Sequence, residues 1–287
     1  MQIGFIGVGL MGGPLARNLI RAGQNVLVYD LSSEAVQRTL AAGSSGQAAS
    51  SLADLASCDL VFTSLPLPEH VSGAMLGDEG LYAQLAKGAT HIELSTIDPG
   101  TANKLASAAA DFGLGYIQCT LGKTPAQAEK AEEPMFIGGD KSLVDKFADI
   151  FKLIGIPHYL GTLEASCAVK LISNLIGMTN VAVLAEGIKI GDKAGIDRNK
   201  LLELLADTGA RSFQMDVRGP WIAADDYQAR FGLDLAKKDL RLGLEMAKDW
   251  DLNLKAMQAA FEYFQKGSAQ GYGQEDCNAV FKIIGQQ

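Results

Sequence analysis

The first thirty residues constrain the fold more than any other stretch of this chain. Gln2 to Ile6 is a short apolar run, and the glycine pattern Gly7-Val8-Gly9-Leu10-Met11-Gly12 follows it at once. A helical pattern then runs to Arg21-Ala22-Gly23, and a second apolar run, Asn25 to Tyr29, stops at Asp30. A strand, a glycine-rich turn, a helix, a strand and an acid in this order are the context in which G-x-G-x-x-G indicates a dinucleotide site.

Each glycine of this pattern has a physical task. Gly7 permits the tight turn, Gly9 lets the backbone approach a pyrophosphate, and Gly12 lets the helix lie close to the sheet. The helix N-terminus adds free N–H groups and a partial positive charge for the phosphates. Asp30 can accept both hydroxyls of an adenosine ribose. The alternative is an ordinary strand–helix–strand turn with incidental glycines.

Composition narrows the class of protein and of partner. The chain has 287 residues, enough for one large domain or two of ordinary size. Its net charge of −8 argues against nucleic acid or an anionic membrane as the main partner, although it does not exclude a local basic pocket. The four cysteines are scattered without a C-x-x-C pair, which suits unpaired thiols in a reducing compartment, and no Cys/His spacing predicts a metal site.

Targeting signals are not expected. The first apolar run has no basic segment before it and belongs to the first strand, so it is not a signal peptide. No apolar stretch is judged long and uninterrupted enough to span a bilayer. We therefore expect a cytoplasmic protein with no membrane partner.

Strands and helices alternate up to Gly161, which predicts an α/β domain with a mainly parallel sheet. The loop 65–68 carries two prolines and is expected to continue neither a strand nor a helix. It should lie at the carboxyl end of the strands, where ligands bind in such sheets. Strands are expected over 2–6, 25–29, 59–64, 89–94, 115–119, 135–137 and 157–160, and helices after the glycine pattern and over 33–40, 50–56, 101–112 and 143–154.

After Gly161 the pattern becomes helical. Residues 166–193 form a helix that is apolar on almost every face, so we expect it to be buried on all sides. The remaining helices are expected over 198–206, 211–217, 235–247, 256–266 and 276–284. The predicted organisation is a dinucleotide-binding domain over residues 1–161 and an all-helical domain over residues 162–287.

The buried helix contains the candidate catalytic pair. Lys170 and Asn174 lie one turn apart on the same face. An ammonium among apolar neighbours has a lowered pKa unless it is paired, which suits proton transfer near neutral pH. The alternative is that Lys170 extends to solvent and that Asn174 is a satisfied core amide. None of the three histidines lies in a strand-end loop beside another titratable group, which argues against histidine as the general acid.

Four motifs resemble those of the β-hydroxyacid dehydrogenases, the group that contains 3-hydroxyisobutyrate dehydrogenase, tartronate semialdehyde reductase and sulfolactaldehyde reductase. The stretch from Gly7 to Leu19 resembles the family's cofactor fingerprint. Leu65-Pro66 and Ser95-Thr96 resemble its two loops beside the nicotinamide. The segment from Lys170 to Asn174 resembles its catalytic lysine helix, and Phe231 to Leu240, ending Lys238-Asp239-Leu240, resembles its late cofactor-contacting segment.

The resemblance covers the whole chain and implies a fold, a reaction and a site. The fold is an α/β Rossmann-type dinucleotide-binding domain followed by an all-α domain with a long central helix. The reaction is reversible hydride transfer between NAD and a small hydroxy acid or anionic semialdehyde. Lys170 would exchange the proton and Asn174 would orient substrate and lysine. The implied cofactor contacts are Gly7, Gly9, Leu10, Met11, Gly12, Asp30, Leu65, Pro66, Thr96 and Lys238.

Two other functions stay open beside this one. The first is an imine or keto-acid reductase of the same fold, and the second is a dinucleotide-binding protein without turnover. For the cofactor, Asp30 and the absence of arginine in Leu31-Ser32-Ser33 favour NAD over NADP. We also expect a homodimer or homotetramer, because a helical domain of about 125 residues built around one long apolar helix leaves apolar faces that a second copy can cover.

The substrate loop departs from the family pattern. Where the family usually has Asp-x-Pro-Val-Ser-Gly-Gly, this chain has the stretch from Gln118 to Thr124, whose Gly-Lys-Thr resembles the Gly-Arg-Thr of sulfolactaldehyde reductases. We expect Gly122, Lys123 and Thr124 to hold the acid group of the substrate through free N–H groups, a hydroxyl and a full charge. The alternative places Lys123 in solvent beside Glu129 and Glu132. Further departures at Glu164, Ser166 and Ser173 leave the substrate open.

Overall fold

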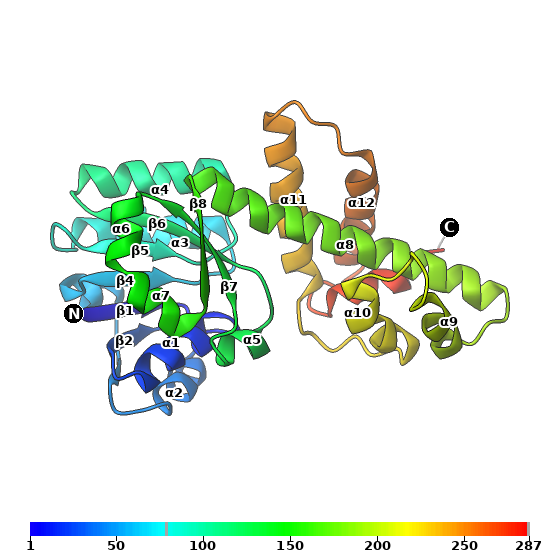
Figure 1. The fold of residues 1–287 in the computed structure, drawn as a ribbon, viewed down its shortest axis with the longest axis horizontal. Helices are drawn as coiled ribbons and strands as arrows, with labels where there is room; N and C mark the ends of the chain where they lie inside the picture. The colour runs from blue at the N-terminus through cyan, green and yellow to red at the C-terminus, as the bar shows by residue number, and fades with distance from the viewer. Residues whose placement is uncertain (78–79, 286–287) are drawn as a thin grey trace. The chain divides into compact units, whose positions relative to one another are not determined.

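The computed structural model describes residues 1–77 and 80–285. They belong to two compact units, Met1–Lys170 and Leu171–Gln287, which are described separately (Figure 1). The division between the units falls inside the helix Leu163–Lys193, whereas the predicted boundary at residue 161 precedes that helix.

The first unit is built on a sheet whose strands, within the described residues, run in the order β3-β2-β1-β4-β5-β6-β7-β8. Neighbouring strands are parallel except for β6 and β7, which confirms the mainly parallel sheet. The strand order reverses between β1 and β4, and ligands bind at such a point. The strands are β1 (Gln2–Ile6), β2 (Asn25–Tyr29), β3 (Gly46–Ala48), β4 (Leu60–Thr63), β5 (Thr90–Glu93), β6 (Gly115–Leu121), β7 (Pro134–Gly139) and β8 (Ile156–Gly161).

Helices cover both faces of this sheet, as Figure 1 shows. Alternate residues of the strands feed two hydrophobic clusters: Phe5 and Phe62 lie in one, and Ile6 and Val61 lie in the other. The first cluster includes α1 (Gly12–Arg21), α2 (Ser33–Leu40), α5 (Pro125–Glu129), α6 (Lys141–Lys146) and α7 (Ala148–Ile154). The second includes η1 (Leu52–Ser57), α3 (Pro68–Leu76), η2 (Leu81–Ala83) and α4 (Pro99–Asp111).

Several elements differ from prediction. The loop 65–68 continues neither a strand nor a helix, as expected, but α3, which was not predicted, begins at Pro68 because proline at the first helical position lacks an N–H that would be unpaired anyway. The single helix expected over 143–154 is two helices separated at Phe147, which has φ −107° and ψ 14°. The segments expected to be helical over 50–56 and 276–284 form the 3₁₀ turns η1 and η3 (Cys277–Lys282), and the short strand β3 was not predicted.

The second unit is all-helical, as predicted. Its elements are most of α8 (Leu163–Lys193), then α9 (Arg198–Leu205), α10 (Phe213–Ala223), α11 (Leu233–Asp249), α12 (Lys255–Ala269) and η3. Leu175, Met178 and Val181 of α8 pack in one core with α11 and α12, and Ala185 and Ile188 pack in a second.

The prediction that α8 is buried on all sides is wrong. Ile172, Ile176, Val183 and Ile190 are 45%, 48%, 54% and 70% exposed. An apolar pattern all round shows that no face requires water, but it does not show that every face is covered. By length and composition this helix could also cross a membrane, contrary to expectation, although core helices of globular proteins pass the same test.

Candidate functional site

The glycine-rich loop between β1 and α1 has the geometry that its pattern predicts. Gly7 has φ +85°, and a Cβ there would lie 2.3 Å from the carbonyl oxygen of Ser64. A Cβ on Gly12 would lie 2.0 Å from the carbonyl oxygen of Gly7, so the helix is packed against the turn. A Cβ on Gly9 would meet no atom within 4 Å. The loop is therefore closed where it packs and open where a phosphate would approach.

Asp30 lies beside this loop at the end of β2. One carboxylate oxygen accepts the N–H of Val8 at 2.8 Å and the other accepts the N–H of Ser32 at 2.8 Å. Each oxygen has further lone-pair capacity for a ribose hydroxyl. Met11, the N-cap of α1, makes no side-chain capping bond, so no side chain competes there with an anion. These residues fit the adenosine and pyrophosphate of a dinucleotide.

The loops that follow β4 and β5 are tied together. The N–H of Leu65 donates to Ser95 Oγ at 2.8 Å, and the N–H of Ser95 donates to Glu93 Oε1 at 2.5 Å. The Leu65 side chain also approaches the glycine loop, since its Cδ2 would lie 2.9 Å from a Cβ on Gly7. Pro66 is exposed and Thr96 is half-buried in these loops. The structure thus brings Leu65 next to the predicted cofactor turn.

A buried chain of hydrogen bonds lies beneath these loops. Thr63 Oγ1 donates to Glu93 Oε2 at 2.5 Å, so it accepts from His91 Nε2 at 2.6 Å. The Nδ1 atom of His91 then accepts from the Tyr82 hydroxyl at 2.7 Å. Burial lowers the pKa of His91 to about 3, so the imidazole is neutral near pH 7. His91 is therefore a buried, neutral member of this chain of hydrogen bonds.

Lys170 is half-buried near the start of α8. Its ammonium donates to the carbonyl oxygen of Leu121, the last residue of β6, at 2.6 Å. Two further contacts fix this end of the helix: Ser166 Oγ donates to the carbonyl of Phe136 at 2.6 Å, and Thr120 Oγ1 donates to the carbonyl of Ser166 at 2.8 Å. The lysine is thus held at the carboxyl end of β6 and directly before the predicted substrate loop.

The turn after β6 differs from prediction in one respect. The N–H groups of Gly122 and Lys123 are not free, because they donate to the carbonyl of Pro134 at 2.9 Å and to Glu133 Oε1 at 2.5 Å. The Gly122 bond extends the antiparallel pairing of β6 with β7 by one residue, which is why this N–H group is not free. Thr124 bonds the side chain of Gln127, and the side chain of Lys123 is exposed.

The alternative places Lys123 in solvent beside Glu129, whose carboxylate is engaged by two other cations. Its carboxylate pairs with Arg17 and with Arg21, the latter at 2.6 Å. The hydrogen bond from Arg17 is the largest influence that lowers the pKa of Glu129, to about 2. This pairing joins α1 to α5.

In the second unit, Asn174 and Lys238 share one partner. Asn174 Nδ2 donates to Asp239 Oδ2 at 2.6 Å, and Lys238 Nζ lies 2.7 Å from Asp239 Oδ1. Lys238 and Asp239 are buried. The side-chain amide of Asn174 is therefore hydrogen-bonded within the protein, as the alternative to a catalytic role predicted.

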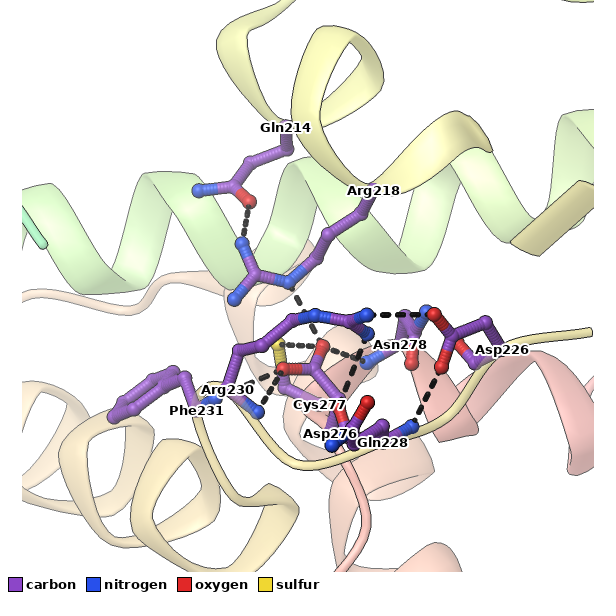
Figure 2. A network of polar contacts seen from close by, with 9 residues as sticks. All are labelled: Gln214, Arg218, Asp226, Gln228, Arg230, Phe231, Asp276, Cys277 and Asn278. Atoms are coloured by element: carbon purple, nitrogen blue, oxygen red, sulfur yellow. Dashed lines mark hydrogen bonds and ion pairs between the residues drawn. The ribbon is translucent and has the colours of Figure 1, made fainter. Parts of the chain in front are cut away.

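A second network holds the segment that leads into α11 (Figure 2). Asp276 is fully buried and accepts from the N–H groups of Arg230 at 3.2 Å and Phe231 at 2.8 Å. Arg218 Nε donates to the other carboxylate oxygen at 3.1 Å. A buried ion pair thus fixes the start of the segment that ends in Lys238.

The sequence did not single out four acids of these sites, Glu93, Glu133, Asp239 and Asp276. Asp239 lies inside the motif Lys238-Asp239-Leu240, so its position next to a predicted cofactor-binding lysine could have identified it. Glu133 carried no such signal, because it follows Glu132 in a polar connection, and only its 0% exposure in the folded chain sets it apart.

Comparison with known proteins gives the family. Residues 2–167 match the model described as the NAD binding domain of 6-phosphogluconate dehydrogenase, and residues 165–284 match the model described as NAD-binding of NADP-dependent 3-hydroxyisobutyrate dehydrogenase. The chain is 32% identical to 2-(hydroxymethyl)glutarate dehydrogenase of Eubacterium barkeri, over 99% of this chain and 94% of that protein. It is 31% identical to the NAD-dependent L-serine dehydrogenase of Pseudomonas aeruginosa, over 99% and 97%.

A solved structure agrees with these relatives. The crystal structure of 3-hydroxyisobutyrate dehydrogenase from Salmonella typhimurium superposes with a TM-score of 0.91 at 25% identity and covers 99% of this chain and 100% of its own. The two family models together match residues 2–284, which include the glycine loop, Asp30 and the helix that carries Lys170. The chain therefore belongs to the β-hydroxyacid dehydrogenase family and is an NAD(P)-dependent oxidoreductase that acts on hydroxyl groups.

Proposed function

We propose that this enzyme transfers hydride reversibly between NAD and a small hydroxy acid or the corresponding anionic semialdehyde. The names of its relatives, a 2-(hydroxymethyl)glutarate dehydrogenase and an L-serine dehydrogenase, describe small hydroxy acids and support the substrate class. Bound nicotinamide supplies or accepts the hydride. The chain's own residues must bind the substrate and move one proton.

The position of Lys170 carries this proposal. Its ammonium donates to the Leu121 carbonyl at 2.6 Å, which directs a charged donor to the carboxyl end of the sheet. In reduction the lysine stabilises the developing alkoxide and donates a proton to it, and in oxidation it accepts that proton. Asn174, one helical turn further along α8, would orient substrate and lysine.

We propose NAD as the preferred cofactor. A 2′-phosphate would meet the carboxylate of Asp30, and Leu31, Ser32 and Ser33 provide no cation beside it. Lys238 and the loops carrying Leu65, Pro66 and Thr96 would contact the nicotinamide half. The acid group of the substrate would meet Lys123, whose side chain is exposed after β6.

The test begins with a panel of anionic semialdehydes and NADH, followed at the nicotinamide absorbance. Lys170→Ala should lose most of kcat, while NADH binding stays nearly unchanged, because the lysine acts on the transition state. Lys193→Ala, an exposed lysine of the same helix, is the matched control and should keep wild-type kcat. If Lys170→Ala retains more than about a tenth of kcat, the proton comes from another group.

A further inference from the structure

Glu133 is an acidic side chain buried without full hydrogen bonding in the first unit. It stands between α5 and β7, and its relative exposure is 0%. Oε1 accepts the N–H of Lys123 at 2.5 Å, whereas Oε2 is buried and has no hydrogen-bond partner in the described structure. Burying a carboxylate oxygen in this way costs free energy, so such a group requires a compensating charge or a function.

The backbone of one turn connects this carboxylate to Lys170. The carbonyl of Leu121 accepts the lysine ammonium at 2.6 Å. The next two N–H groups point the other way: Gly122 donates to the carbonyl of Pro134 and Lys123 donates to Glu133. Three successive residues thus bind the lysine on one side and the Glu133 segment on the other.

The charges around Glu133 are few and identifiable. Among the described residues, Lys170 on α8 and Lys123 after β6 are the cations that act on it, and burial together with the charge of Glu133 raises the pKa of the Cys119 thiol on β6. Burial raises the pKa of Glu133, while the Lys123 N–H and the charge of Lys170 oppose that rise. By reciprocity the carboxylate favours the protonated form of Lys170.

We propose that Glu133 is a positioning residue for Lys170: its buried carboxylate holds the turn that carries the lysine's acceptor and provides the lysine's counter-charge. This inference rests on the proposed role of Lys170 in proton transfer. Glu133 transfers no proton itself. It keeps the lysine charged, and therefore ready to donate in the reductive direction, until the proton passes to the alkoxide.

The experiment measures the proton affinity of Lys170 without substrate. Trace acetylation with acetic anhydride at several pH values reports the neutral fraction of each lysine, and mass spectrometry of the Lys170 peptide separates it from Lys193, the internal reference. In Glu133→Gln the labelling curve of Lys170 should move to lower pH by about one unit, so at a pH on the rising limb Lys170 labels roughly tenfold faster. Glu132→Gln, the exposed neighbour with the same charge change, should leave the curve in place.

A graded variant protects the test against a folding defect. Glu133→Asp keeps the charge but withdraws it by one methylene, so its labelling rate should fall between wild type and Glu133→Gln. If Glu133→Gln does not give the wild-type circular dichroism spectrum, Glu133→Asp decides the question. Unchanged Lys170 labelling in the folded variants overturns the role of Glu133, whereas retained activity in Lys170→Ala overturns the proposed role of Lys170 in proton transfer instead.

Discussion

The carboxylate of Asp30 carries two tasks at the end of β2. It accepts the N–H groups of Val8 and Ser32, and it faces the place where the adenosine ribose of a dinucleotide would lie. A neutral ribose can use the remaining lone pairs, but a 2′-phosphate brings a like charge that costs roughly a few kcal/mol in a partly buried site. We therefore expect kcat/KM with NADH to exceed that with NADPH by at least about tenfold.

The matched variant for this prediction is Asp30→Asn. It removes the charge but keeps an oxygen that can accept one of the two N–H groups, so the turn should persist. The ratio of kcat/KM for NADH and NADPH should fall in the variant. Equal or better kcat/KM with NADPH in the wild type would contradict the assignment of Asp30.

His91 makes a prediction about stability and pH. Its pKa is about 3 in the folded protein, against 6.5 for an ordinary histidine, because the ring is fully buried. As the pH falls below about 6.5, His91 therefore binds a proton in the unfolded chain but not in the folded chain. The free energy of unfolding should fall as the pH drops from 6.5 towards 3, with a slope approaching about 1.4 kcal/mol per pH unit from this one group.

Urea unfolding at pH 6.5, 6.0, 5.5 and 5.0 measures that slope. His91→Gln should lower stability at every pH, since it disturbs the bonds to Thr63 and Tyr82, but its slope should be flatter than that of wild type. His158→Gln changes an exposed histidine and should keep the wild-type slope. Parallel slopes for wild type and His91→Gln would show that His91 titrates normally.

The residues predicted from sequence and those missed differ in how local their signals are. Gly7, Gly12 and Asp30 act within one strand–turn–helix–strand unit, so spacing along the chain was enough to place them. Glu133 and Asp239 matter because of partners outside their own segments: Lys123 lies 10 residues before Glu133, and Asn174 lies 65 residues before Asp239. A charge run such as Glu132-Glu133 does not reveal which member the sheet will bury.

At the scale of elements, periodicity predicted the buried strands and most helices but misjudged positions governed by single residues. Pro68 ends no element but begins α3, a helix that the sequence pattern did not predict. The amphipathic pattern over 143–154 did not reveal the break between α6 and α7 at Phe147. The ring of Phe147 is buried, as it would also be in one continuous helix. The apolar pattern of α8 was right about length and wrong about complete burial.

The turn between β6 and α5 makes the prediction about substrate. Its N–H groups at Gly122 and Lys123 are engaged, so we expect the exposed side chain of Lys123, rather than these two N–H groups, to bind an acid. Lys123→Ala should raise KM for the best substrate of the panel about tenfold or more, for a lost charged hydrogen bond of roughly 1.5–3 kcal/mol. Its kcat should change little, because the contact is made equally in the ground and transition states.

Lys130→Ala is the control for that change, since it removes an exposed charge just beyond α5. The panel should include a sulfonate and a carboxylate of similar length, because a full positive charge can hold either anion. The same KM in Lys123→Ala and wild type would mean that Lys123 points to solvent.

At the scale of the molecule, the sequence predicted an α/β unit followed by a helical unit because strand and helix periods are properties of each segment. The surface of α8 was not predictable in this way. Its exposed Ile172, Ile176, Val183 and Ile190 are spaced by four and seven residues, so they follow one face of the helix. Large apolar side chains in such a row indicate a surface that another chain covers.

We therefore expect a homodimer or homotetramer in which this face of α8 is covered by a second copy, since closed symmetric assemblies are the usual outcome for a self-complementary patch. Light scattering at micromolar concentration should give a mass of at least two chains. Val183→Glu places a charge in the middle of the face and should shift the mass towards one chain at the same concentration. Leu252→Glu, which changes an exposed leucine outside α8, should leave the mass unchanged. A wild-type mass equal to a single chain would refute the assembly, and an assembled Val183→Glu protein would place the interface elsewhere.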